Sequence, residues 1–247
     1  MANQQDQLSA HLLQHKSLPV SPTWLQSFLT TQQRNIHISA LTQTAFFRIL
    51  NSDIRQSLFR NPSSIFPIDI FDPTVQERRI AGPIPVQVLD IEDIGTSIWN
   101  QVEAIERVER GEAVRGREIV RTVNVGDEEQ DATNNRAIAG TANPGGGNTN
   151  ANESNGPHRL ILQDAKGTRA VGIEMSRISG VGVNTLFIGA KLMIRNATVA
   201  RGMILLTPDS VTLLGGKIEA MDQAWKAGRK ARLLEKITGA GGEDAQS

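Results

Sequence analysis

The sequence of 247 residues contains no cysteine and no tyrosine, and aromatic residues make up only 4% of it. The absence of cysteine excludes a disulfide framework, thiolate metal sites and thiol catalysis, and is typical of proteins in a reducing compartment. No apolar run approaches the roughly 18 residues that a membrane span needs, and residues 1–8 are too polar for a secretory signal. We therefore expect a soluble intracellular protein with no metal, no cofactor, no membrane contact and no small-molecule substrate.

A net charge is absent as well, because 26 Lys and Arg residues balance 26 Asp and Glu residues. Proteins that bind nucleic acid through non-specific phosphate contacts are usually strongly basic, since the release of counterions supplies their affinity. A modest surplus occurs in residues 158–216, with seven basic and three acidic side chains. The charge balance thus favours weak or indirect contact with DNA over tight binding.

The N-terminal third of the chain has helical character. Six of the seven phenylalanines precede residue 72, and Ser21-Pro22 introduces an apolar stripe with the spacing of a helix. Pro62, Pro67 and Pro73 then favour an extended connector. The sequence predicts a helical bundle of three or four helices, with its connector, over residues 1–80.

From Pro85 onward the apolar residues alternate with the period of a strand. One strand is followed by a long insertion, a hairpin over residues 159–175, a glycine-containing link, a hairpin over residues 191–206 and a closing segment. Five short strands in this order predict an OB-fold β-barrel over residues 81–216. An apolar stripe predicts a C-terminal helix within residues 217–247, so the fold class is α+β.

The insertion between the first two predicted strands covers residues 96–157. Its part from 124 to 157 has eight Asn, six Gly and no Leu, Phe, Trp or Met, which predicts disorder because little apolar surface is available for burial. Its stem has glutamates at every third position with arginines between them, and we interpret these as a solvated helix face. The acidic residues are Glu103, Glu106, Glu109 and Glu112.

Enzyme motifs are incomplete in this sequence. Gly180-Val181-Gly182 lacks the third glycine of a dinucleotide loop, and Gly215-Gly216-Lys217 lacks both the upstream glycine and the following Ser or Thr of a phosphate loop. No spacing supports a pair of nucleophile and base. We expect a protein that is not an enzyme.

Binding of single-stranded DNA is the first alternative for an OB fold. Such sites stack bases on aromatic side chains, but Phe187 and Trp99 are the only aromatic residues of the predicted barrel and the insertion stem. Arg159, Lys166 and Arg169 are candidates for weak phosphate contact. A stand-alone single-stranded DNA-binding protein therefore stays an alternative, and a scaffold that docks another nuclear assembly through the helical unit is a second one.

Two segments carry a resemblance to a known family. Residues 18–25 read LPVSPTWL, and residues 202–217 read GMILLTPDSVTLLGGK, close to the family's run of strand, Pro-Glu-Asn turn, strand and Gly-Gly. Residues 50–55, 88–95 and 160–164 are similar to further blocks. The chain resembles the RecQ-mediated genome instability protein family, the OB-fold accessory subunit of topoisomerase III, and in particular its short fungal members.

This resemblance implies a non-catalytic role in the nucleus. The family binds topoisomerase III, joins it to a RecQ-family helicase, and promotes double Holliday junction dissolution and decatenation, with the insertion reaching the topoisomerase gate. On this hypothesis Trp99, Ile119 and Val120 supply apolar partner contacts, and a barrel rim with Lys191 and Arg195 supplies polar ones. We accordingly expect Lys191→Glu to weaken the complex without unfolding the barrel.

Overall fold

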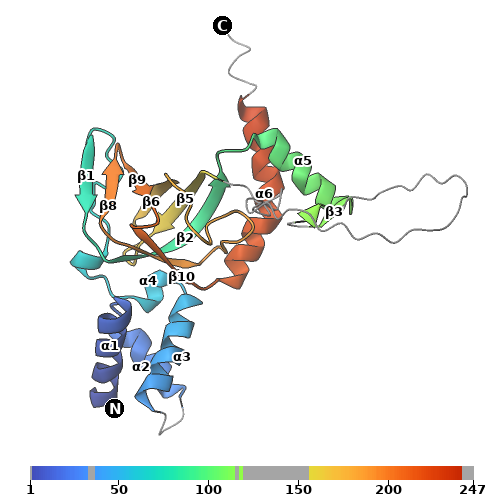
Figure 1. Ribbon diagram of the computed structural model, residues 1–247. Helices are drawn as coiled ribbons and strands as arrows, with labels where there is room; N and C mark the ends of the chain where they lie inside the picture. Colours follow the sequence, from blue (N-terminus) through green and yellow to red (C-terminus); the bar gives the residue numbers. More distant parts are fainter. Residues whose placement is uncertain (1, 33–36, 115–116, 119–155, 241–247) are drawn as a thin grey trace, which may run out of the picture.

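The computed structural model describes residues 2–32, 37–114, 117–118 and 156–240 (Figure 1). The helices are α1 (Ala2–Lys16), α2 (Pro22–Thr30), α3 (Ile38–Leu50), α4 (Ile54–Ser57), the 3-10 turn η1 (Pro62–Ser64), α5 (Ile98–Glu109) and α6 (Glu219–Ala240). The main sheet contains β1 (Glu77–Ile80), β2 (Ile84–Asp93), β5 (His158–Gln163), β6 (Arg169–Glu174), β7 (Lys191–Ile194), β8 (Ala197–Ala200), β9 (Met203–Leu206) and β10 (Val211–Gly215). A two-stranded ribbon, β3 (Ala113–Val114) with β4 (Arg117–Glu118), follows α5.

The helical unit, α1 to α4, forms as the sequence predicts. Pro22 occupies the first turn of α2, where the missing N–H costs nothing. In α3 the buried residues Leu41, Ala45 and Ile49 recur every four positions, so they lie on one face of the helix. They share one apolar core with residues of α1 and α2. Burial of this common stripe holds the short helices together, because isolated helices of this length are marginal in water.

The sheet is mixed and curls on itself, with the strand order β1-β8-β9-β6-β5-β2-β7-β10. β7 and β8 are separated only by Arg195 and Asn196, yet β7 pairs with β2 whereas β8 pairs with β9. The break falls at Asn196, whose φ of 48° interrupts the strand. β9 in turn pairs in parallel with β6. This connectivity matches the predicted five-stranded barrel, with the last two predicted strands each broken in two and β1 added at an edge.

The interior of the curl holds the larger of the two apolar cores. Val86, Val88, Leu160, Leu162 and Ile204 are fully buried there. The second core lies in the helical unit, yet it includes Ala165 and Met193 of the sheet region. The two cores therefore meet across a packed junction between the helices and the sheet, which Figure 1 shows at one end of the curl.

The connector belongs structurally to the sheet, although residues up to 80 were predicted to belong with the helices. Phe66 and Ile70 are buried in the core of the sheet, and β1 pairs with β8. The Phe66 N–H also donates to Asp164 Oδ2 at 2.8 Å. The unit built around the sheet thus starts well before residue 80.

Helix α6 carries the predicted apolar stripe and packs along the sheet. Trp225 is buried, as predicted, and its Nε1 donates to Asp90 Oδ1 at 2.5 Å. Asp222 accepts from the Ile188 N–H at 3.1 Å, which fixes the first turns of the helix. α6 therefore forms a firm support against which α5 lies (Figure 1).

Candidate partner-binding site

Lys191 is buried, so the prediction that it lies on an exposed rim is wrong. Its side chain is 2% exposed, and Nζ donates to the backbone oxygens of Leu50 at 3.1 Å and Gly189 at 2.6 Å. Leu50 is the last residue of α3, where helix carbonyls have no partner within the helix. Lys191 therefore caps α3 from the sheet and stabilises the junction between the two units.

The environment of Lys191 shifts its titration. Burial lowers the pKa of Lys191 from 10.5 to about 7, and the nearby Asp53 carboxylate acts in the opposite direction. Asp53 is itself partly buried, which raises its pKa, but the hydrogen bonds from the Arg55 side chain and N–H leave this pKa below its usual value. The charged ammonium is thus disfavoured in the folded protein relative to the unfolded chain.

We expect stability to rise with pH because of Lys191. Between pH 7 and 10.5 the unfolded chain keeps the proton that the folded protein has released, so the free energy of unfolding should increase by up to about 1.4 kcal/mol per pH unit. Below pH 7 both states bind the proton and this contribution is flat. Urea unfolding at pH 7.5, 8.5 and 9.5 should give this slope, and Lys191→Met should remove it. Equal slopes for both proteins would contradict the shifted pKa; no cysteine or tyrosine titrates in this range.

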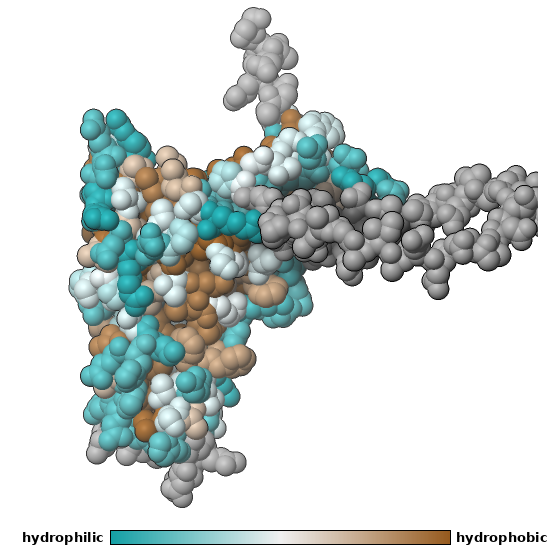
Figure 2. All heavy atoms as spheres, in the orientation of Figure 1, coloured by the Kyte–Doolittle hydropathy of each residue, from teal (hydrophilic) through white to brown (hydrophobic). Residues whose placement is uncertain are grey.

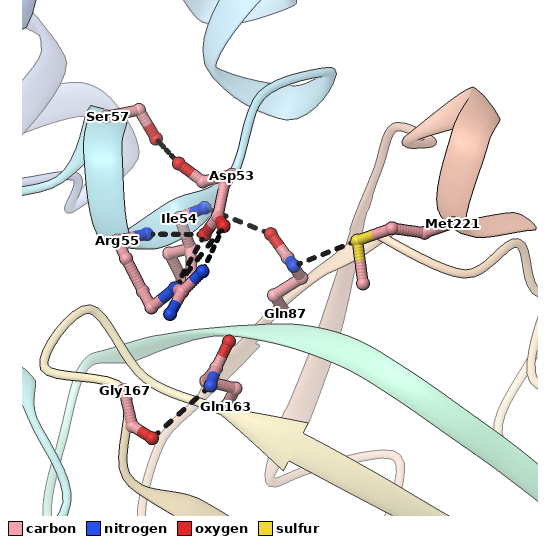
Figure 3. Close-up of polar contacts among 8 residues, drawn as sticks. All are labelled: Asp53, Ile54, Arg55, Ser57, Gln87, Gln163, Gly167 and Met221. Carbon is pink, nitrogen blue, oxygen red and sulfur yellow. Dashed lines mark hydrogen bonds and ion pairs between the residues drawn. The ribbon is translucent and has the colours of Figure 1, made fainter.

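Gln87 is a further junction residue, one that was not among the predicted site residues. It lies opposite Lys191 in the β2–β7 register and is buried. Its Oε1 accepts from the Ile54 N–H of α4 at 3.0 Å, and its Nε2 lies 3.8 Å from Met221 Sδ of α6. Figure 3 shows the amide between these two helices. In the sequence, Gln87 could have been noticed as a polar residue between Val86 and Val88 in a mostly apolar strand.

The Gly215-Gly216 pair allows close approach of the helical unit. Gly216 has a φ of +90°, and a Cβ there would lie 2.2 Å from the Leu50 oxygen. The next residue, Lys217, donates its N–H to Asn51 Oδ1 at 3.2 Å. Gly216 is therefore a packing contact with the end of α3, whereas Gly215 has open space around it and is favoured by its own φ of +89°.

Arg195 lies away from the buried lysine. It is exposed and its NH2 donates to Ser17 Oγ at 3.0 Å, so it links the sheet to the end of α1. The surface where the sheet meets the helical unit has apolar side chains bordered by hydrophilic ones (Figure 2). Arg195 is thus exposed whereas Lys191 is not, and the contact of Arg195 with a partner stays a prediction.

Trp99 is strongly exposed, at 66%, on the first turn of α5. The helix is held from two sides. Gln101 Nε2 donates to the backbone oxygens of Asp93 and Thr96 at 3.0 and 2.9 Å, and Lys230 of α6 pairs with glutamates of α5. These pairs are Lys230 with Glu106 at 3.2 Å and with Glu109 at 2.7 Å. α5 therefore presents its tryptophan from a fixed position at the start of the insertion.

The glutamates of the stem are largely solvated, as the spacing predicts. Arg107 pairs with Glu103 at 4.0 Å, and Arg110 pairs with Glu106 at 3.8 Å and Glu112 at 3.0 Å. Ile119 and Val120, the two remaining predicted contact residues, lie outside the described residues, and so does nearly all of the segment 124–157 that was predicted to be disordered.

The three candidates for phosphate contact are divided between the start of β5 and the turn that follows it. Arg159 pairs with Glu92 at 3.2 Å, and Lys236 pairs with the same carboxylate at 2.5 Å. Lys166 and Arg169 lie exposed at the β5–β6 turn. The eight strands of the main sheet, all within the described part of the chain, contain no Phe, Trp or Tyr. This surface offers phosphate contacts without a platform for stacking bases.

The residues that the structure describes contain no group of three or more His, Cys, Asp or Glu side chains that is arranged to hold a metal ion. In the same part of the chain, every helix is too short or too polar to cross a membrane.

Comparison with known proteins agrees with both structural units. Residues 12–57 match a family described as "RMI1, N-terminal helical domain", and residues 66–229 match "RMI1, N-terminal OB-fold domain". The chain is also 31% identical to RecQ-mediated genome instability protein 1 of Schizosaccharomyces pombe over 241 residues, which cover 96% of this chain and 97% of that protein. The resemblance seen in the sequence is thereby confirmed, and the chain belongs to the RecQ-mediated genome instability protein 1 family.

Proposed function

We propose that this chain is a non-catalytic accessory subunit of topoisomerase III. It binds the topoisomerase, acts with a RecQ-family helicase in the nucleus, and promotes double Holliday junction dissolution and decatenation. The family membership and the name of the relative from Schizosaccharomyces pombe support this proposal. The role requires binding surfaces rather than chemistry from this chain.

The observation that carries the proposal is the exposed Trp99 on the firmly held helix α5. Tryptophan is enriched among the residues that dominate protein interfaces, and its exposed fraction here is 66%. Because Gln101 and Lys230 fix the helix on the sheet and on α6, little conformational freedom is lost when a partner binds.

Action on a topoisomerase gate has a simple physical requirement. An accessory protein shifts the equilibrium between open and closed gate states only if it binds one of them better. In our proposal the α5 surface supplies the constant contact, and the insertion that follows it reaches the moving part of the enzyme. Binding of single-stranded DNA by the chain on its own is less well supported, because the strands of the main sheet lack aromatic side chains.

Trp99→Ala is expected to weaken the complex with topoisomerase III from the same source about 30-fold, as for an interface residue worth about 2 kcal/mol. Size-exclusion chromatography with light scattering of the wild-type mixture should show one complex, and titration calorimetry should give the change in affinity. The melting temperature should stay unchanged, since the exposed side chain supports no core.

Phe71→Ala is the matched control, because Phe71 is similarly exposed, at 62%, on the connector. It should leave the affinity as it is. Two separate peaks for the wild-type mixture would rule out topoisomerase binding as the main function. Tight, strongly salt-dependent binding of single-stranded DNA by the isolated chain would instead favour the alternative.

A further inference from the structure

A second surface lies on the helical unit, apart from α5. Helices α2 and α3 border a hollow of about 440 Å³. It is lined by Trp24, Ser27, Phe28, Thr31, Phe47, Arg48, Asn51 and Ser52. The sheet, α5 and α6 contribute no lining residue, so this groove belongs to the helical unit alone.

The floor and wall of this groove are aromatic. Trp24 stacks on Phe28 with ring centroids 5.5 Å apart and planes within 3°. Phe47 is 69% exposed, whereas Ala45 and Ile49 on either side of it in α3 are buried. An apolar surface of this kind, left open on a folded unit, is typical of a binding site for another apolar surface.

Three polar side chains of the groove donate hydrogen bonds to carbonyl oxygens of the helical unit. Thr31 Oγ1 donates to the Phe28 oxygen at 2.7 Å, and Asn51 Nδ2 donates to the Phe47 oxygen at 2.8 Å. Ser52 Oγ donates to the Ile49 oxygen at 3.0 Å. Such groups do little to recognise a polar ligand, so the groove offers apolar contact together with the charge at its edge.

That charge is Arg48. It is exposed, and the described part of the chain provides no ion-pair or hydrogen-bond partner for its guanidinium. In sequence, no Asp or Glu occurs between Asp6 and Asp53, whereas Lys16 and Arg34 occur there besides Arg48. Arg48 is the only charged side chain among the described residues that line the groove, so the groove attracts a partner with carboxylates and repels a basic one.

We propose that the α2–α3 groove binds an amphipathic helix of a partner protein that carries acidic residues. Apolar side chains spaced at i, i+3 or i+4, and i+7 fill the groove against Trp24 and Phe47, and a carboxylate on the neighbouring turn pairs with Arg48. A nucleic acid fits less well, because single strands need a row of cations along the backbone and Arg48 is the one cation lining the described groove. This inference is independent of topoisomerase binding through α5.

Phage display of a random 16-residue peptide library on the full chain tests the proposal. Enriched peptides should combine Leu, Phe or Trp at helical spacing with Asp or Glu. Synthetic copies should bind the wild-type chain and lose about tenfold or more in affinity to Phe47→Ala and to Arg48→Glu. Exchanging the acidic residues of the peptide for Lys should restore binding to Arg48→Glu and abolish it for the wild type.

The controls separate binding from folding. Phe59→Ala removes a similarly exposed phenylalanine, at 53%, that does not line the groove, and it should bind the peptides like the wild type. Arg48→Lys should retain most of the affinity. Peptides that bind Phe47→Ala equally well, peptides without acidic residues, or a library without enrichment would each overturn the proposal. So would a 20-nucleotide oligothymidylate that binds the wild type and not Arg48→Glu, which would identify a nucleic-acid site instead.

Discussion

Lys191→Glu is expected to lower the free energy of unfolding by about 3 to 5 kcal/mol, the cost of an uncompensated buried charge. The new carboxylate would face the backbone oxygens of Leu50 and Gly189, which now accept from the lysine, and it would lie near Asp53. All of these groups repel a negative charge. Because small domains are stable by only about 5 to 15 kcal/mol, the helical unit should separate from the sheet or the chain should unfold. This outcome replaces the expectation, drawn from sequence, of a folded variant with weakened binding.

Urea unfolding followed by circular dichroism measures this effect directly. Arg195→Glu is the matched control, since it makes the same charge change four residues further on at an exposed position. It should change the free energy of unfolding by no more than about 1 kcal/mol. Equal stability of the two variants would show that the lysine is not buried at the junction.

Glu174→Ala is expected to be the second severe substitution, with a loss of about 3 to 5 kcal/mol. The Glu174 carboxylate is 3% exposed and accepts from His158 Nδ1 at 2.5 Å, from the His158 N–H at 3.2 Å and from the Ile178 N–H at 2.8 Å. Its removal takes a buried acceptor away from His158 and from the Ile178 N–H. Because His158 begins β5, directly after the insertion, the loss should loosen the point where the insertion rejoins the sheet.

Thermal and urea unfolding of Glu174→Ala and Glu174→Gln provide the measurement. The glutamine keeps one acceptor oxygen, so its loss should be smaller than that of alanine. Glu92→Ala serves as control near the end of β2 in the same sheet. Glu92 is partly exposed and its pairs with Arg159 and Lys236 lie near solvent, so its removal should cost about 1 kcal/mol or less. Similar losses for Glu92→Ala and Glu174→Ala would contradict a special role of the buried carboxylate.

The helical unit, the order of the strands and α6 were predictable because their signals are local. The spacing of Leu41, Ala45 and Ile49 predicts which face of α3 is buried, and the apolar stripe of α6 predicts the burial of Trp225. The solvated glutamates of α5 follow from spacing in the same way, since their arginine partners lie within one turn. β1 was missed because its four residues, Glu77–Ile80, are strand only through pairing with β8.

The candidate site was predicted less well, and Lys191 shows why. From sequence, a lysine in a strand is expected to be exposed. Lys191 is buried because it caps α3 at Leu50, a residue 141 positions away in sequence. Gln87 and Glu174 are likewise defined by N–H groups of other elements. Periodicity, turn residues and composition alone determined the helices of the N-terminal unit, α6 and the strands of the main sheet other than β1. Which polar side chains are buried, and which remain free for partners, was decided only by tertiary packing, because a polar group is buried where distant segments supply its hydrogen-bond partners.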